Sequence, residues 1–249
     1  MNFSVGKNSS VNGNTPLNIV VCGVGGNGVV LASRAIARAA LRDGRSVRVG
    51  EVHGLAVRGG TVVSHVRIGL EEGGVIIPKG EGNLMVAFEP LEALRFMPFL
   101  RKGCPVLLNE QPFIGVTSHI GLNPYPEREE IMKRLSSRHD VYRVNASGAA
   151  EELGSIQMLN TVMMGVLAGS GLAGLNCQYL EDAVLELVPP KVADKNREAF
   201  RFGMEMIAEL MKQRAKQNSA NNSVSGQNCD EKHDHASTPP AASELYMYR

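Results

Sequence analysis

The sequence contains no tryptophan, and only 5% of its 249 residues are aromatic. Proteins that bind single-stranded nucleic acid stack the bases on aromatic side chains, so this scarcity argues against such binding. The formal net charge is +1, without the electrostatic excess that favours nucleic acid or an anionic membrane surface. We therefore expect neither a nucleic-acid partner nor a membrane partner.

Cysteine is also scarce, and the four cysteines lie far apart at Cys22, Cys104, Cys177 and Cys229. No C-x-x-C pair is present, although that spacing is typical of zinc and iron–sulfur ligands. We expect this chain alone to hold no metal ion and no cluster. The dispersed thiols are expected to be free, as in a reducing cytoplasm, which is the location that we predict.

Long apolar segments suited to a membrane or a signal peptide are missing as well. Residues 1–16 are polar and lack the apolar centre of a signal peptide, so we expect a flexible leader. The apolar run over residues 158–175 is interrupted by Asn160, Thr161 and several glycines, which favours a buried helix. Residues 217–249 are rich in Asn, Ser, Gln, Ala and Pro and are predicted to be a disordered tail. Residues 17–216 remain as the predicted folded domain.

Short apolar segments alternate with helical patterns through that domain. The segments that predict strands are residues 19–22, 46–49, 61–68, 84–88, 106–108 and 141–144. Helices are predicted at residues 29–42, from Pro90 to a stop or bend near Pro98, and at residues 127–135, 155–167, 179–187 and 192–212. Continuously apolar strands are typical of parallel sheets covered on both faces. The sequence thus predicts an α/β fold: a Rossmann-like, doubly wound, mostly parallel sheet with helices on both faces.

A glycine-rich turn follows the first predicted strand and opens the first helix. Its glycines Gly23, Gly25 and Gly28 match the G-x-G-x-x-G pattern of dinucleotide sites, and Gly26 and Asn27 lie between them. Glu51 follows the second strand, where such sites place a ribose-binding carboxylate. Glycines also let a strand turn into a closely packed helix. An NAD-binding oxidoreductase is therefore one alternative, and a purely structural turn is another.

The segment over residues 51–61 gathers polar groups between two predicted strands. Glu51, His53 and Arg58 are the candidate catalytic side chains. Arg58 precedes Gly59, Gly60 and Thr61, and a guanidinium beside glycine N–H groups suits a carboxylate or a phosphate. Alternatively, Arg58 pairs with Glu51 and fixes the loop.

Four blocks of this sequence resemble the gamma-type domain of the 2-oxoacid:ferredoxin oxidoreductases, most of all the indolepyruvate type. They are G-V-G-G-N-G-V-V from Gly23, E-V-H-G-L-A-V-R-G-G-T-V-V-S-H-V-R-I-G from Glu51, N-T-V-M-M-G from Asn160, and P-P-K from Pro189 with Asn196, Ala199, Phe200 and Gly203. The resemblance covers about residues 17–212. The family commonly has Gln at the positions of Asn27 and Val57, so these two residues depart from the pattern.

The resemblance implies a small subunit of an enzyme that oxidatively decarboxylates an aryl 2-oxoacid to an acyl-CoA and passes electrons to ferredoxin. Thiamine diphosphate, Mg²⁺ and 4Fe–4S clusters would belong to a large alpha subunit, with CoA as co-substrate. The residues expected to face the thiamine site or the CoA path are Gly23, Gly25, Gly26, Asn27, Gly28, Arg58, Gly59, Gly60 and Thr61. Arg58 would hold an anionic group. A non-catalytic binding module remains a further alternative.

Overall fold

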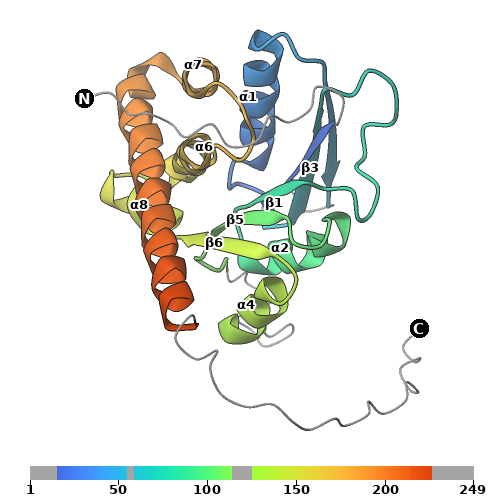
Figure 1. Cartoon of the computed structure of the whole chain (residues 1–249). Helices are drawn as coiled ribbons and strands as arrows, with labels where there is room; N and C mark the ends of the chain where they lie inside the picture. Colours follow the sequence, from blue (N-terminus) through green and yellow to red (C-terminus); the bar gives the residue numbers. More distant parts are fainter. Residues whose placement is uncertain (1–15, 55–58, 114–124, 226–249) are drawn as a thin grey trace, which may run out of the picture. The chain divides into compact units, whose positions relative to one another are not determined.

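The computed structural model describes residues 16–54, 59–113 and 125–225. The chain forms two units, Met1–Met211 and Lys212–Arg249. The first unit contains a sheet and its covering helices (Figure 1).

The sheet is mixed and has six strands in the order β2-β3-β1-β4-β5-β6. Its strands are β1 (Leu17–Val24), β2 (Val47–His53), β3 (Thr61–Ile68), β4 (Leu84–Ala87), β5 (Pro105–Asn109) and β6 (Asp140–Val144). Strands β1, β4, β5 and β6 are parallel neighbours, whereas β3 runs antiparallel to both β1 and β2. The predicted α/β class with a mostly parallel sheet is confirmed.

Alternate residues of the central strands enter two separate cores. In β1, Ile19 and Val21 belong to one core, and Val20 and Cys22 belong to the other. All four are fully buried. Burial of both faces explains why this strand is continuously apolar in the sequence.

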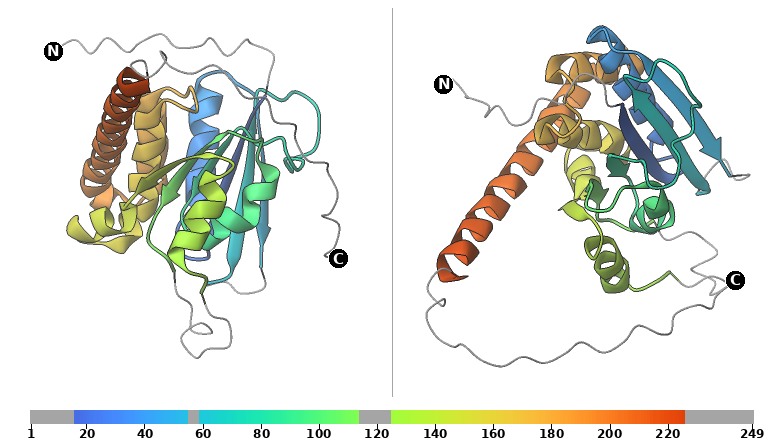
Figure 2. Two further views of the ribbon diagram at one scale, coloured as in Figure 1. Left: turned by 60° about the horizontal axis from the view of Figure 1, so that its bottom comes forward. Right: turned by 45° about the vertical axis from the view of Figure 1, so that its right-hand side comes forward.

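Each core is closed by its own set of helices (Figure 2). The first contains residues of α1 (Val29–Arg42), α5 (Ala146–Glu152), α6 (Leu159–Ser170), α7 (Cys177–Leu187) and α8 (Ala193–Ser225). The second contains residues of α2 (Pro90–Phe96) and α4 (Arg128–Ser136), together with Ile77. Short 3-10 turns are η1 (Met97–Phe99), η2 (Ile156–Met158) and η3 (Pro190–Val192). Among the described residues, no helix combines the length and the apolar character that crossing a membrane requires.

One local expectation is corrected at β2. The strand extends to His53, so Glu51 and His53 lie within it rather than in a loop. It is longer because Glu51 and His53 pair with Ser64 and Val62 of the antiparallel β3. The two strands are thus antiparallel neighbours in the sheet, as in a hairpin.

The boundary of the predicted tail is also corrected. Helix α8 continues to Ser225, so residues 217–225 are helical although we predicted disorder from residue 217. The segment before them is rich in Glu, Met, Lys, Gln and Ala, which are strong helix formers. Residues 226–249 of the predicted tail and residues 1–15 of the predicted leader lie outside the described part of the chain.

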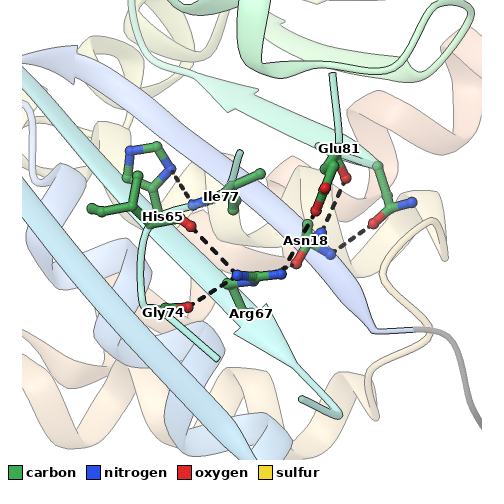
Figure 3. A network of polar contacts seen from close by, with 8 residues as sticks. Asn18, His65, Arg67, Gly74, Ile77 and Glu81 are labelled. Carbon is green, nitrogen blue, oxygen red and sulfur yellow. Dashed lines mark hydrogen bonds and ion pairs between the residues drawn. The ribbon is translucent and has the colours of Figure 1, made fainter. Parts of the chain in front are cut away.

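A buried polar network fixes the connection between β3 and β4 (Figure 3). Arg67 is only 7% exposed, and its Nε donates to Asn18 Oδ1 at 3.0 Å while Nη1 donates to the carbonyl oxygen of Gly74 at 3.0 Å. Glu81 lies 3.8 Å from Arg67 Nη2. A buried charge requires such partners, and these contacts supply them to the guanidinium of Arg67. The network lies at the end of the sheet opposite the glycine-rich turn.

Candidate functional site

The candidate site lies where the four parallel strands reach their carboxyl ends. In open α/β sheets this edge is where ligands bind. Because β3 is antiparallel, it begins at the same edge, where Thr61 is opposite Val24 of β1. Strand β2 ends there too, with His53 opposite Val62. The sheet thus brings the glycine-rich turn and the end of the β2–β3 hairpin together.

Main-chain hydrogen bonds join these two segments. The N–H of Gly25 donates to the carbonyl oxygen of Gly60 at 2.7 Å, and the N–H of Gly59 donates to the carbonyl oxygen of Gly25 at 3.1 Å. Within the hairpin, Gly54 N–H donates to Thr61 O at 3.0 Å. Two regions that the sequence marked separately are therefore one assembly.

Two glycines of the turn are required by close packing. A Cβ atom on Gly28, whose φ is 81°, would lie 2.6 Å from Nδ2 of Asn160 at the start of α6. A Cβ atom on Gly23 would lie 2.8 Å from Cβ of Phe88. Gly26 differs, because a Cβ atom there would meet nothing within 4 Å. The turn therefore combines a packing role with one glycine that borders open space.

A cavity of about 540 Å³ opens beside the turn. The turn, the start of α1 and the hairpin line it with Val24, Gly25, Gly26, Gly28, Val29, Val30, His53, Gly54 and Val62. The valines make its walls largely apolar, and the half-exposed His53 contributes an ionisable group. Of the predicted catalytic candidates, His53 thus borders this cavity.

Glu51 lies away from that cavity. Its carboxylate is 3.9 Å from Arg34 Nε and 3.7 Å from His53 Nε2. Strand β3 lies between β2 and β1, so two strand spacings, or about 10 Å, separate the strand that carries Glu51 from the strand that leads into the turn. A ribose-binding carboxylate belongs on the strand next to the turn, so this geometry argues against the dinucleotide alternative. Arg58, with residues 55–57, lies outside the described residues, and its predicted role and pairing stay predictions.

Sequence reasoning missed a pair of buried carboxylates at the end of β4. Glu89 and Glu92 are 2% and 4% exposed. Glu89 caps α2, because its Oε2 accepts from the N–H of Glu92 at 2.9 Å. Its Oε1 accepts from Tyr125 OH at 2.5 Å and from the N–H of Phe113 at 3.4 Å. The available signal was Glu-Pro-x-Glu directly after a buried strand.

The second carboxylate reaches the β2–β3 hairpin. Glu92 Oε1 accepts from Thr61 Oγ1 at 3.2 Å and lies 3.4 Å from Arg95 Nη1, while Oε2 is buried without a hydrogen-bond partner among the described residues. Burial raises the pKa of Glu92; Arg95 opposes this change, Glu89 adds to it, and Thr61 opposes it. Burial, together with Glu92 and Glu89, also raises the pKa of the Cys22 thiol, so Cys22 is not an activated nucleophile.

Further polar contacts follow the same edge. Asn109, at the end of β5, donates from Nδ2 to Phe88 O and Ser147 Oγ, each at 3.0 Å. In α6, Thr161 Oγ1 donates to Asn196 Oδ1 at 2.6 Å, which joins two of the blocks singled out in the sequence. Within the described ranges, no group of three His, Cys, Asp or Glu side chains could hold a metal ion.

Solved structures define the class of this fold. The chain is similar to pyruvate oxidoreductase subunit PORC of Thermotoga maritima, with a TM-score of 0.59 and 22% identity over 77% of this chain and 97% of that one. It is also similar to part of a 2-oxoglutarate:ferredoxin oxidoreductase chain from Magnetococcus marinus, with a TM-score of 0.53, 20% identity, and coverage of 80% of this chain but 31% of that chain. The fold is thus that of an α/β subunit of oxoacid oxidoreductases.

The chain belongs to the pyruvate ferredoxin/flavodoxin oxidoreductase family, whose sequence pattern matches residues 18–206. The indolepyruvate oxidoreductase subunit IorB of Archaeoglobus fulgidus is 42% identical over 190 residues, which are 75% of this chain and 93% of that protein. The predicted family membership and the prediction of an oxidoreductase subunit are confirmed.

Proposed function

We propose that this chain is the small subunit of an indolepyruvate-type 2-oxoacid:ferredoxin oxidoreductase acting in the cytoplasm. The reaction would convert an aryl 2-oxoacid and CoA into an acyl-CoA and CO₂, with two electrons passed to ferredoxin. The identity of 42% to an indolepyruvate oxidoreductase subunit supports this substrate class. A large alpha subunit would hold thiamine diphosphate, Mg²⁺ and the iron–sulfur clusters.

The observation that carries the proposal is the hydrogen-bonded contact between Gly25 and the Gly59–Gly60 pair at the carboxyl ends of the parallel strands. At the adjoining start of α1, the N-cap residue Gly28 makes no side-chain cap hydrogen bond among the described residues, and the positive end of the helix dipole favours an anionic ligand. The valine walls of the neighbouring cavity favour an apolar group. We propose that this assembly faces the partner's thiamine site or the path of CoA.

Within that assembly, this chain would contribute shape and polar contacts. Arg58 immediately precedes Gly59, and its guanidinium would hold the carboxylate of the oxoacid or a phosphate of CoA. His53 borders the cavity and would add a hydrogen bond. Thiamine diphosphate bound to the partner would supply the stabilisation of the carbanion.

The test is steady-state kinetics of the complex co-expressed with its large subunit, with a panel of 2-oxoacids, CoA and a viologen acceptor. Arg58→Ala should raise the KM of CoA or of the oxoacid about tenfold or more, because hydrogen bonds to charged groups contribute about 1.5–3 kcal/mol. Arg134→Ala, on the exposed face of α4, is the matched control and should behave as wild type. Unchanged turnover and unchanged KM values in Arg58→Ala would contradict the role of Arg58. Absence of oxoacid-dependent acceptor reduction in the wild-type complex would contradict the function itself.

A further inference from the structure

Glu92 is a buried carboxylate beside the candidate site that the proposed function does not use. It projects from the first turn of α2 to Thr61, the first residue of β3, although 31 positions separate them in the sequence. Arg95 contacts both, because its Nη1 donates to Thr61 Oγ1 and lies 3.4 Å from Glu92 Oε1. The three side chains therefore form one closed contact group between a helix and the hairpin.

Thr61 transmits this contact to the main chain of the site. It directly follows Gly60, whose carbonyl oxygen accepts from Gly25 N–H at 2.7 Å. Its own carbonyl oxygen accepts from Gly54 N–H at 3.0 Å. The side chain of Thr61 thus fixes the base of the hairpin at the residue where the hairpin meets the glycine-rich turn.

The choice of a carboxylate at this position is not explained by packing alone. The Glu92 side chain is 5% exposed, and its Oε2 has no hydrogen-bond partner among the described residues. An unpaired buried carboxylate oxygen costs free energy, whereas an amide of the same size would avoid a buried charge. The charge does strengthen the contact with Thr61, because a hydrogen bond to a carboxylate is stronger than one to an amide.

We propose that Glu92 is a positioning residue of the site: through Thr61 it holds Gly59 and Gly60 against the glycine-rich turn and so keeps the binding edge in its competent arrangement. The effect on catalysis rests on the proposed function, whereas the effect on the hairpin does not. The two are separated by two different measurements.

The first measurement is hydrogen exchange of backbone amides in the full chain within the co-expressed complex. Glu92→Gln and Thr61→Val should each speed the exchange of the Gly25, Gly54 and Gly59 amides about tenfold, since each weakens a charge-assisted hydrogen bond. Thr61→Ser keeps the hydroxyl and should restore slow exchange. Glu181→Gln is the matched control. Glu181 is also a mostly buried carboxylate near arginines, and its Oε1 has no hydrogen-bond partner among the described residues, but it lies on α7.

The second measurement is the kinetics of the same variants. Glu92→Gln and Thr61→Val should raise the KM of CoA about tenfold with kcat changed less than twofold, and Thr61→Ser should return KM to within about twofold of wild type. If the role were merely structural, kcat and the urea midpoint of unfolding would both fall in these variants. Thr61→Ser would then be no better than Thr61→Val.

The outcomes are distinguishable. Unchanged amide exchange in both Glu92→Gln and Thr61→Val overturns the positioning role, whatever the kinetics show. Faster exchange in a complex that turns over no 2-oxoacid supports the positioning role and removes the proposed function. Because Thr61→Val alters a different element from Glu92→Gln, it still tests the proposal if one variant fails to fold.

Discussion

His65 is 1% exposed, and its role depends on its charge state. Its Nδ1 accepts from the N–H of Ile77 at 3.4 Å, and its ring meets the ring of Phe99 edge to face at 5.1 Å. Burial lowers the pKa of His65, and the neighbouring Arg67 lowers it further. A protonated imidazole could not accept from Ile77, so the folded chain favours the neutral form.

Acidification should therefore destabilise the fold through His65. Its pKa in the folded chain lies below the unfolded value of about 6.5, so the unfolded chain binds more protons at acidic pH. This stabilising contribution is present above pH of about 6.5 and is lost as the pH falls through the folded pKa. His65→Gln keeps an acceptor but cannot titrate, so urea unfolding should show a shallower loss of stability between about pH 7 and pH 5.

A second histidine also contributes to the pH dependence of stability, so His65→Gln should remove only part of it. Burial also lowers the pKa of His139, which contacts Cys104 Sγ at 3.7 Å. His139→Gln should flatten the pH dependence by a separate amount, and the double variant should flatten it most. Identical slopes in wild type and His65→Gln would contradict the prediction.

At the residue scale, the glycines that shape the main chain of the site were easier to predict from the sequence than the side chains around it. The glycines of the turn could be predicted because the requirement for a tight turn leaves a local pattern. Glu89 and Glu92 were missed, since a Pro at a helix start with glutamates around it is read in sequence only as the beginning of a helix. Their partners Tyr125 and Thr61 lie 36 and 31 positions away, so only the fold brings them together.

Among the elements, α6 and the start of α8 are in backbone contact. A Cβ atom on Gly165 of α6 would overlap the carbonyl oxygen of Phe200, and one on Gly203 of α8 would overlap the carbonyl oxygen of Val162. Glycine at these positions lets the helices approach more closely than any other residue would allow.

Gly203→Ala should therefore destabilise the chain although alanine is the better helix former. The overlap should cost about 1–3 kcal/mol, against a propensity gain of about 1 kcal/mol, which leaves a net loss of up to about 2 kcal/mol in the free energy of unfolding. Urea denaturation measures this loss. Glu205→Ala, on the exposed side of α8, should change stability by less than about 0.5 kcal/mol. A gain in stability from Gly203→Ala would show that the helices do not approach this closely.

Element boundaries were predictable where the pattern is local. The helix over Val29–Arg42 was predicted with its correct ends, because apolar spacing and Gly44 mark it. The extent of β2 was not, because its final residues become strand only by pairing with β3. Helix α5 (Ala146–Glu152) was missed, since small residues leave no clear periodic apolar stripe.

For the whole molecule, the proposed function requires a surface that a large subunit covers. Phe113 is 43% exposed and follows the end of β5, and one of its ring atoms lies 3.4 Å from the position of a Cβ on Gly59. Aromatic side chains are enriched at protein interfaces, and this one lies at the candidate binding edge.

We therefore expect Phe113→Asp to weaken assembly with the co-expressed large subunit. Aromatic residues at interface centres contribute more than about 1 kcal/mol, so the dissociation constant should rise about tenfold. Size-exclusion chromatography with titration of the separate subunits measures it. Leu41→Asp is the matched control, because Leu41 is 60% exposed at the end of α1 away from this edge. Equal affinity of wild type and Phe113→Asp would exclude this edge as the interface.

Because β3 is antiparallel to β2, the segment that joins these strands can vary independently of the rest of the fold, which a crossover connection would not allow. Because β2 and β3 form a hairpin, residues 54–60 join two adjacent strand ends. The number and identity of these residues can therefore change without displacing a helix. Evolution or engineering could thus exchange this short stretch between relatives while the sheet order and both hydrophobic layers stay as they are.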